Sequence, residues 1–242
     1  MIGARRFWTE VSVVEVPGGF ALRLDDRPLR TPAKAELVVP TRALAEEIAA
    51  EWRGVEGEIR PDLLPFTKAA NAAVDRVAPD PAPLVDGLAA YGESDLLCYR
   101  ADSPAALAAR QAAAWDPPLA WAAAHLGAPL AVTEGLRHKP QDPASLAALR
   151  AAVAAHDPFA LTALSELVSL SGSLVLALAT ASGAMTPAEA WAASRVDETW
   201  QEEQWGLDME AAAVARRRET DFLRAARLLE KLALHCNKAI GP

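Results

Sequence analysis

The sequence predicts an α+β protein, with a small antiparallel β-rich unit that contains one helix over residues 1–60 and a larger all-helical unit over residues 61–242. Between Phe7 and Pro40 apolar and polar residues alternate with a period of two, and Pro-Gly-Gly and Asp-Asp-Arg-Pro turns interrupt the alternation. After Pro61 the chain becomes rich in alanine and its apolar residues recur every three or four positions, as in helices. A hydrophobic content of 52% is ordinary for a globular protein with a sizeable core.

The β-rich unit reads as a meander, with strands at residues 9–14, 20–24 and 36–39. Such a sheet needs a cover for one face, and the next segment supplies it. Thr41 is a suitable N-cap, Leu44, Ile48 and Trp52 form a stripe at a spacing of four, and Gly54 ends the helix. We therefore expect Trp52 to be a structural core residue between helix and sheet.

Helix starts recur in the second unit as a capping side chain followed by a proline at the first helical position. Thr186 also has Glu189 three residues later, which predicts a capping box. The apolar stretch 159–181 is interrupted by Ser171-Gly172-Ser173, and it predicts two buried helices rather than a membrane span. The predicted starts are Ser103-Pro104, Asp116-Pro117, Asp142-Pro143, Asp157-Pro158 and Thr186-Pro187.

Composition excludes several classes of function. The net charge of −8 without a basic stripe argues against nucleic acid and against anionic membrane surfaces. No glycine-rich phosphate loop is present, so no nucleotide is expected, and the four histidines have no metal-ligand spacing. Cys98 and Cys236 predict a reduced compartment with two structural thiols. No cofactor, metal or membrane insertion is expected, and no signal peptide is visible at the N-terminus.

The segment from Val196 to Glu210 is the most distinctive part of the chain, with six carboxylates, two tryptophans and neither lysine nor arginine. It predicts one helix. On that helix Val196, Trp200 and Leu207 form a core stripe, and the opposite side carries Trp191, Glu198, Glu202, Trp205 and Met209. Glu198 and Glu202 are four residues apart, with no basic residue at a neighbouring spacing to relieve their repulsion. This face predicts either a binding surface or a solvated acidic face.

An enzyme of unknown reaction is an alternative hypothesis, with Glu93, Asp95 and His125 as acid/base candidates. A carboxylate in the sequence Tyr-Gly-Glu-Ser-Asp more often caps a turn. A second alternative is a small-ligand binding module that uses a cleft between the two units. A broad acidic and apolar surface would favour a binding protein, whereas a deep pocket with converging titratable groups would favour an enzyme.

Several short motifs resemble the assembly chaperones of the alpha subunit of the F-type ATP synthase, a family of mitochondria and alphaproteobacteria. The resemblance extends from about Phe7 to about Leu232. It is carried by Asp26-Arg27-Pro28-Leu29-Arg30-Thr31-Pro32, Val39-Pro40-Thr41, Glu51-Trp52, Asp197-Glu198 and Gln204-Trp205-Gly206.

The resemblance implies a non-enzymatic chaperone that binds the unassembled alpha subunit and shields its subunit interface. Mitochondrial members carry a cleavable targeting segment and none is visible here, which fits a bacterial cytoplasmic member or a mature form. The resemblance places partner binding at Asp197, Glu198, Glu202, Trp205 and Gly206. Structural roles fall to Trp52, Arg27, Pro28, Thr31 and Pro32. The resemblance does not decide which carboxylate is essential.

Overall fold

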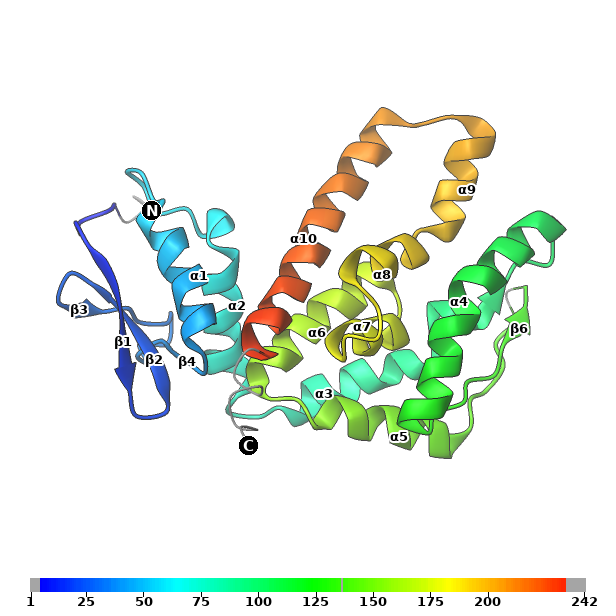
Figure 1. The fold of residues 1–242 in the computed structure, drawn as a ribbon, viewed down its shortest axis with the longest axis horizontal. Helices are drawn as coiled ribbons and strands as arrows, with labels where there is room; N and C mark the ends of the chain where they lie inside the picture. The colour runs from blue at the N-terminus through cyan, green and yellow to red at the C-terminus, as the bar shows by residue number, and fades with distance from the viewer. Residues whose placement is uncertain (1–4, 136, 234–242) are drawn as a thin grey trace, which may run out of the picture. The chain divides into compact units, whose positions relative to one another are not determined.

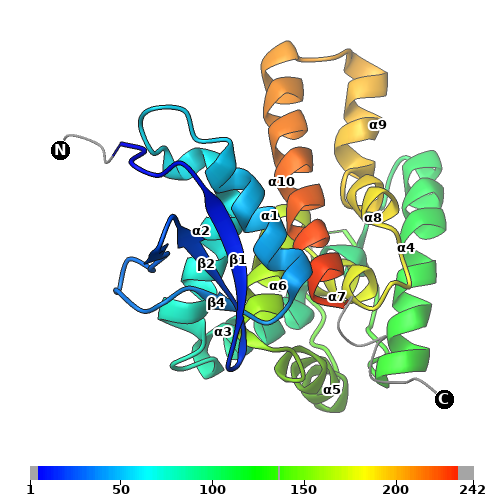
Figure 2. The same ribbon diagram turned by 60° about the vertical axis from the view of Figure 1, so that its left-hand side comes forward.

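A computed structural model describes residues 5–135 and 137–233. The chain forms two compact units, each with its own core. Within the described residues, the first comprises 5–81, 158–162 and 227–233, and the second comprises 82–157 and 163–226. An antiparallel sheet lies near the N-terminus and helices dominate the remainder, so the predicted α+β class is confirmed (Figure 1). Figure 2 shows the sheet and its neighbouring helices from a second side.

The sheet of the first unit is built around the hairpin of β1 (Val11–Val16) and β2 (Gly19–Leu24). These strands pair antiparallel from Val11 opposite Leu24 to Val16 opposite Gly19. Two short strands, β3 (Arg27–Pro28) and β4 (Val38–Val39), both pair with β2. The alternation predicted a meander, and the β1–β2 hairpin together with the short strands β3 and β4 forms it.

Helix α1 (Arg42–Arg53) packs its apolar stripe against this sheet. Thr41 is the N-cap and its hydroxyl accepts a hydrogen bond from the Leu44 amide at 3.1 Å. Leu44 and Ile48 are fully buried and Trp52 is 8% exposed. The unit continues with a 3₁₀ turn and two helical segments. These are η1 (Pro61–Leu63), α2 (Pro65–Ala72) and the π-helical η2 (Ala73–Val77).

The second unit is mainly helical, with one small parallel pair of strands, β5 (Tyr99–Arg100) and β6 (Thr133–Glu134). Its first helical segments are α3 (Ala82–Ala89), η3 (Ala90–Ser94) and η4 (Leu96–Cys98). The helices that follow are α4 (Ala105–Leu126), α5 (Pro143–Ala154), α6 (Pro158–Ser171), α7 (Leu174–Ala181), α8 (Pro187–Ser194), α9 (Val196–Trp205) and α10 (Met209–Ala233). Helices α6 and α10 contribute residues to both units.

Most of the predicted helix starts are confirmed. Helices α5, α6 and α8 begin at the prolines of their predicted pairs, and α4 begins directly after Pro104. Asp142 caps α5, and the Thr186–Glu189 capping box of α8 is complete. The predicted start at Asp116-Pro117 is wrong, because Pro117 and Pro118 lie inside α4. Tertiary packing holds this helix together, since Trp115 and Leu119 on either side of the prolines are buried.

The apolar stretch 159–181 forms two helices, as predicted. Helix α6 ends at Ser171, Gly172 has a φ of +73°, and Ser173 caps α7 by accepting a hydrogen bond from the Leu176 amide. No helix within residues 5–135 and 137–233 is long and apolar enough to cross a membrane. Cys98 is a buried free thiol, and Cys236 lies outside the described residues.

Candidate functional site

The acidic segment forms two helices rather than the single helix that the sequence predicted. Helix α9 ends at Trp205, and Gly206 follows with a φ of +91°. Asp208 then caps α10, because its Oδ1 accepts hydrogen bonds from the Glu210 and Ala211 amides at 2.8 and 3.2 Å. Figure 1 shows α9 and α10 running in opposite directions, joined by residues 206–208.

This break corrects the predicted faces of the segment. Leu207 lies in the turn, Met209 begins α10, and Trp191 belongs to α8, so none of them extends a face of α9. The local signal was present in the sequence. A glycine just after an apolar residue ends a helix, and an aspartate two residues later starts another.

One side of α9 faces α4. The Asp197 carboxylate accepts a hydrogen bond from the Gln111 side-chain amide at 2.7 Å. The Arg110 guanidinium lies 5.3 Å from the ring centre of the half-buried Trp200 and pairs with Glu203 at 2.9 Å. Val196, at the start of the helix, is 7% exposed. Asp197, Trp200 and Glu203 therefore hold α9 in place, and their side chains are engaged within the chain.

The other side of α9 forms a groove with α10, which we call the α9–α10 groove. Its volume is about 450 Å³. Carboxylates from α9 and the turn lie along it, together with the small apolar residues of α10 and two arginines. The lining residues are Arg195, Glu198, Gln201, Glu202, Trp205, Gly206, Asp208, Ala211, Val214, Ala215 and Arg218.

The carboxylates of this groove are partly neutralised, contrary to the sequence prediction. Arg195 Nη1 lies 3.0 Å from Glu198 Oε1, and its Nη2 lies 3.5 Å from Glu202 Oε1. The expectation that no basic residue relieves the Glu198–Glu202 repulsion is therefore wrong. Arg195 stands one residue before the segment that the pattern delimited, at the favourable i, i+3 spacing from Glu198.

Large apolar side chains are exposed at the rim of the groove. Trp205 is 79% exposed, Leu207 is 56% exposed and Met209 is 69% exposed. These three residues lie within five positions of the chain, at the end of α9, in the turn and at the start of α10. Contiguous exposed apolar groups surrounded by polar ones are typical of surfaces that bind other proteins.

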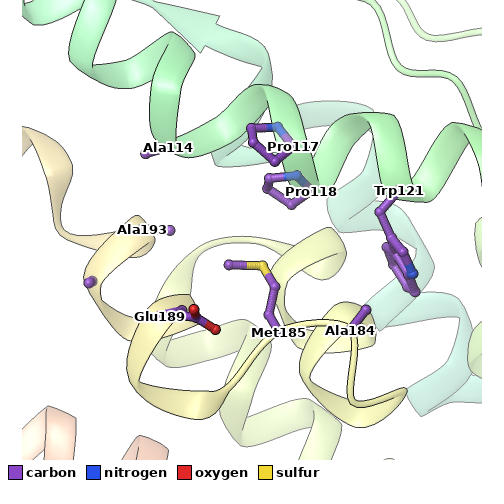
Figure 3. A pocket seen from close by; sticks show the side chains of 9 residues that line it. Ala114, Pro117, Pro118, Trp121, Ala184, Met185, Glu189 and Ala193 are labelled. Atoms are coloured by element: carbon purple, nitrogen blue, oxygen red, sulfur yellow. The ribbon is translucent and has the colours of Figure 1, made fainter.

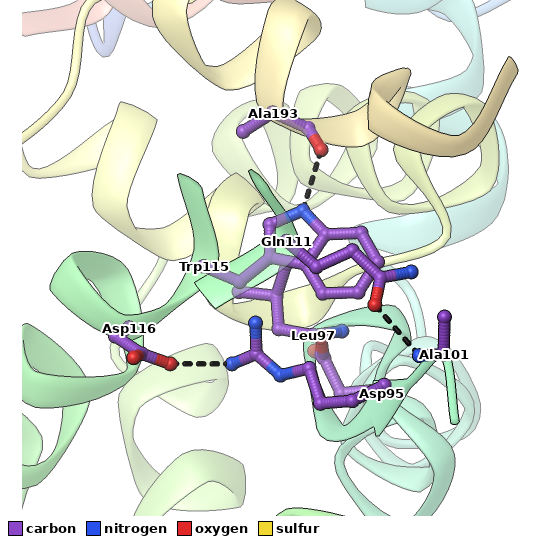
Figure 4. Close-up of polar contacts among 8 residues, drawn as sticks. Asp95, Leu97, Ala101, Gln111, Trp115, Asp116 and Ala193 are labelled. Atoms are coloured by element: carbon purple, nitrogen blue, oxygen red, sulfur yellow. Dashed lines mark hydrogen bonds and ion pairs between the residues drawn. The ribbon is translucent and has the colours of Figure 1, made fainter. Parts of the chain in front are cut away.

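Polar contacts hold α4, the helix against which α9 packs (Figure 4). Gln111 is 2% exposed and its side-chain oxygen accepts a hydrogen bond from the Ala101 amide at 2.7 Å. The Trp115 indole donates to the Ala193 carbonyl at 2.7 Å, which attaches α4 to the last turn of α8. Arg100 lies 5.1 Å from the Trp115 ring centre and pairs with Asp116 at 2.7 Å.

The acid/base candidates of the enzyme hypothesis are engaged in structural contacts. Asp95 is fully buried, and its carboxylate caps η4 and the start of α7 by accepting hydrogen bonds from the Leu97 and Val175 amides at 3.1 Å each. Burial raises the pKa of Asp95 despite these donors. Glu93 pairs with His138 at 3.1 Å on the surface.

His125 also makes a structural contact, because its Nδ1 lies 3.2 Å from the Trp121 carbonyl within α4. In residues 5–135 and 137–233, no group of three or more histidine, cysteine or carboxylate side chains is arranged to hold a metal ion. In the part of the chain that the structure describes, Glu93, Asp95 and His125 therefore contact different partners and do not contact one another.

A second concave site lies between α4 and the segment that leads into α8 (Figure 3). We call it the α4–α8 pocket. Its volume is about 490 Å³ and its wall is mostly apolar. In Figure 3 the Met185 side chain extends toward Pro118, with Glu189 and Trp121 on either side of it. The lining residues are Ala114, Pro117, Pro118, Trp121, Ala184, Met185, Glu189, Ala192 and Ala193. Sequence reasoning missed this pocket.

The N-terminal motif residues lie in the first unit. The Trp52 indole donates to Thr67 Oγ1 at 3.0 Å, and its ring centre is 5.1 Å from that of Trp8. Arg27 lies 5.3 Å from the Phe7 ring centre. Thr31 is buried, whereas Pro28 is half-buried and Pro32 is exposed. These contacts are compatible with the predicted structural roles and include no residue of the α9–α10 groove.

Comparison with known proteins gives consistent matches. The family model described as ATP12 chaperone protein matches residues 5–123. The crystal structure of Atp12 from Paracoccus denitrificans is 48% identical, with a TM-score of 0.91, and the match covers 94% of this chain and 98% of that chain. A mutant of P. denitrificans Atp12p matches with the same identity and TM-score over 94% of this chain and 97% of that chain.

A candidate chaperone from Agrobacterium tumefaciens is 43% identical with a TM-score of 0.89, over 94% of this chain and 86% of that chain. The matches thus extend over both the sheet and the helices. The resemblance that the short motifs indicated is confirmed, and the chain belongs to the ATP12 chaperone family.

Proposed function

We propose that this protein binds the unassembled alpha subunit of the F-type ATP synthase and shields its subunit interface until the catalytic head assembles. Membership of the ATP12 chaperone family supports the chaperone role. The alpha subunit as client follows from the family resemblance of the sequence motifs. We place this action in the bacterial cytoplasm, and we expect it to need no nucleotide, because the sequence has no phosphate-binding loop.

The exposed Trp205 beside the α9–α10 groove is the observation that carries this proposal. A tryptophan that is 79% exposed on a folded surface has no stabilising role within the chain comparable to that of a buried one. Tryptophan is enriched among the residues that dominate the energy of protein interfaces. With Leu207 and Met209 beside it, the side chain offers a compact apolar anchor for the apolar interface of an unpaired subunit.

The carboxylates of the groove supply the polar rim of this surface. Within residues 5–135 and 137–233, Glu198 and Glu202 each pair with Arg195 alone, and their side chains are 48% and 36% exposed. Both can exchange that contact for a basic group of the client, which favours orientation and rate of association. Asp197 differs from them, because Gln111 already holds its carboxylate. We therefore assign Glu198 and Glu202 to client contact and Asp197 to the positioning of α9.

A binding role without catalysis agrees with this surface. An enzyme needs titratable groups that reach one substrate, and Asp95 is fully buried with backbone amides bound to both of its oxygens. The α9–α10 groove offers charges and an apolar anchor along an open surface instead, which suits recognition of a protein.

Co-expression tests the proposal. The alpha subunit is produced alone, with this chain, and with its Trp205→Ala variant, and the soluble alpha subunit is measured in nucleotide-free buffer. The wild-type chain should keep the subunit soluble and co-purify with it, and the variant should retain far less. Leu63→Ala is the matched control, since Leu63 is 61% exposed on η1 in the first unit. Equal solubility of the subunit with and without the wild-type chain contradicts the proposal.

A further inference from the structure

The α4–α8 pocket combines an apolar wall with a carboxylate and with helix carbonyls that have no donor four residues later. Its volume of about 490 Å³ is within the usual range for pockets that receive a ligand. Pro118, Trp121 and Met185 provide the apolar part of the wall. A purely apolar pocket would bind any hydrophobic side chain, so the polar atoms at its edge decide its specificity.

Two backbone carbonyls of α4 lack their regular helical partners at this wall. Residues 117 and 118 are both prolines inside the helix and have no N–H group. The carbonyls of Ala113 and Ala114 therefore cannot accept the usual bond from the residue four positions later. Ala114 and both prolines line the pocket, so this break in the regular hydrogen bonding of α4 lies at its wall.

Glu189 adds a negative charge at the opposite side of the pocket (Figure 3). Its Oε2 accepts hydrogen bonds from the Thr186 amide at 2.9 Å and from the Thr186 hydroxyl at 2.7 Å. In the part of the chain that the structure describes, its Oε1 accepts no hydrogen bond. These Thr186 hydrogen bonds lower the pKa of Glu189, so the carboxylate is ionised at neutral pH.

We propose that the α4–α8 pocket receives a lysine or arginine side chain of the client protein. The aliphatic stem lies along Pro118, Trp121 and Met185, and the cationic head lies between Glu189 and the carbonyls of Ala113 and Ala114. A long basic side chain matches this combination, because it has an apolar stem and only hydrogen-bond donors at its head. An apolar side chain would cover Glu189 and the carbonyls without giving them a donor.

The inference that this side chain belongs to the client protein rests on the proposed function. Helix α4 relates the pocket to α9, since Arg110 and Gln111 contact the side of α9 away from the groove, while Ala114, Pro118 and Trp121 line the pocket about one to three turns later. The end of α8 lines the pocket through Ala193 and leads through Arg195 into α9. A protein docked on α9 can therefore continue along the same helices into the pocket.

Methyl NMR with selectively labelled methionine tests the chemistry of the pocket without the client. The chain has three methionines, and Met185 lies in the pocket while Met209 lies at the start of α10. The protein is titrated with n-butylguanidinium and separately with 1-hexanol, and Met185→Leu assigns the pocket signal. We expect a saturable shift of the Met185 signal, with n-butylguanidinium binding about tenfold more tightly than 1-hexanol because its donors meet charged and carbonyl acceptors.

Glu189→Gln is the informative variant, because glutamine also completes a capping box and so keeps the start of α8. It should weaken n-butylguanidinium binding about fivefold or more and leave 1-hexanol binding unchanged. Equal or tighter binding of 1-hexanol, or no shift of the Met185 signal with either probe, overturns the proposal.

Binding of the alpha subunit then tests the source of the side chain. Glu189→Gln should lower the affinity of the chain for the alpha subunit about tenfold, whereas Asp86→Asn, an exposed carboxylate on α3, should leave it unchanged. Unchanged affinity of the Glu189→Gln variant overturns the client as the source. Failure of the wild-type chain to bind the subunit at all overturns the proposed function and the client as source together. The Met185 titration remains a separate measurement of the pocket.

Discussion

The side-chain amide of Gln111 donates a hydrogen bond to Asp197 Oδ1 at 2.7 Å and so joins α4 to the first turn of α9. The Oε1 atom of the same amide group accepts a hydrogen bond from the Ala101 backbone amide at 2.7 Å. Gln111 is 2% exposed, so both hydrogen bonds form where water is scarce. One buried amide group thus links the segment after β5, helix α4 and the helix that carries the proposed client surface.

Removal of this link should destabilise the second unit. Gln111→Ala leaves the Ala101 amide without its acceptor, and we expect the free energy of unfolding to fall by about 1–3 kcal/mol. Asp197→Asn keeps an oxygen that can accept from Gln111, and its cost should be about 1 kcal/mol or less. Urea denaturation of both variants measures the difference. Two equal losses of stability would contradict the positioning role of Gln111.

Trp52 should act through the stability of the first unit. Trp52→Arg places a charged guanidinium in a core site that is 8% exposed, and we expect a loss of about 3–5 kcal/mol or more. Trp52→Phe keeps an aromatic ring beside Trp8 and loses the hydrogen bond to Thr67, at a cost of about 1–3 kcal/mol. Thermal melts rank the two variants. A normal melting temperature for Trp52→Arg would place this residue in a binding surface instead.

Local signals in the sequence predicted most of the fold. The β1–β2 hairpin, the Thr41 cap and the capping box at Thr186 depend on residues within a few positions of one another, and such patterns are visible in one sequence. The Pro117–Pro118 pair was misjudged for the same reason. Proline disfavours a helix interior locally, but the burial of its neighbours in α4 decides the outcome.

The candidate site was predicted less completely because it depends on contacts between distant residues. Gln111 and Asp197 are 86 positions apart, and no local pattern relates them. The α4–α8 pocket likewise combines residues from two separated segments. The pairing of Arg195 with Glu198 is different, since its i, i+3 spacing is a local signal that lies just outside the acidic segment, which begins at Val196.

Asp95 should make the stability of the protein depend on pH. Burial raises its folded-state pKa above the ordinary value of 3.8, so the folded protein keeps this proton at a pH where the unfolded chain has lost it. Its favourable contribution is complete below pH 3.8 and is lost as the pH rises through the raised pKa. Asp95→Asn cannot ionise, so the stability of the wild type minus that of the variant should fall as the pH increases from 4 upward.

Urea denaturation of both proteins at several pH values measures this difference, and the subtraction removes the effect of the other carboxylates. The variant itself should be less stable at low pH. One asparagine oxygen can accept from Leu97 or from Val175, and its NH₂ group then opposes the other amide. A difference that rises with pH would show that the ionised carboxylate is the favoured form in the folded state.

Glu198→Lys should abolish client binding while the fold stays intact. The Glu198–Glu202 spacing alone predicts a gain of about a few tenths of a kcal/mol, because the substitution relieves a like-charge repulsion. The contact with Arg195 turns the expected gain in stability into a loss, because the variant loses an ion pair at 3.0 Å and places a lysine beside the arginine. Both side chains are partly exposed, so the loss should be about 0.2–1 kcal/mol. The melting temperature should therefore fall only slightly.

Binding should respond far more strongly than stability. A lysine at position 198 meets the basic group of the client that the glutamate is proposed to accept, and such a like-charge contact costs several kcal/mol. Glu56→Lys is the charge-matched control, since Glu56 is an exposed carboxylate after α1 in the first unit. Capture of the alpha subunit by each variant, compared at equal folded concentration, decides the assignment. If Glu198→Lys captures the subunit as well as Glu56→Lys does, the carboxylates of the α9–α10 groove are only solvated and the client contacts another surface.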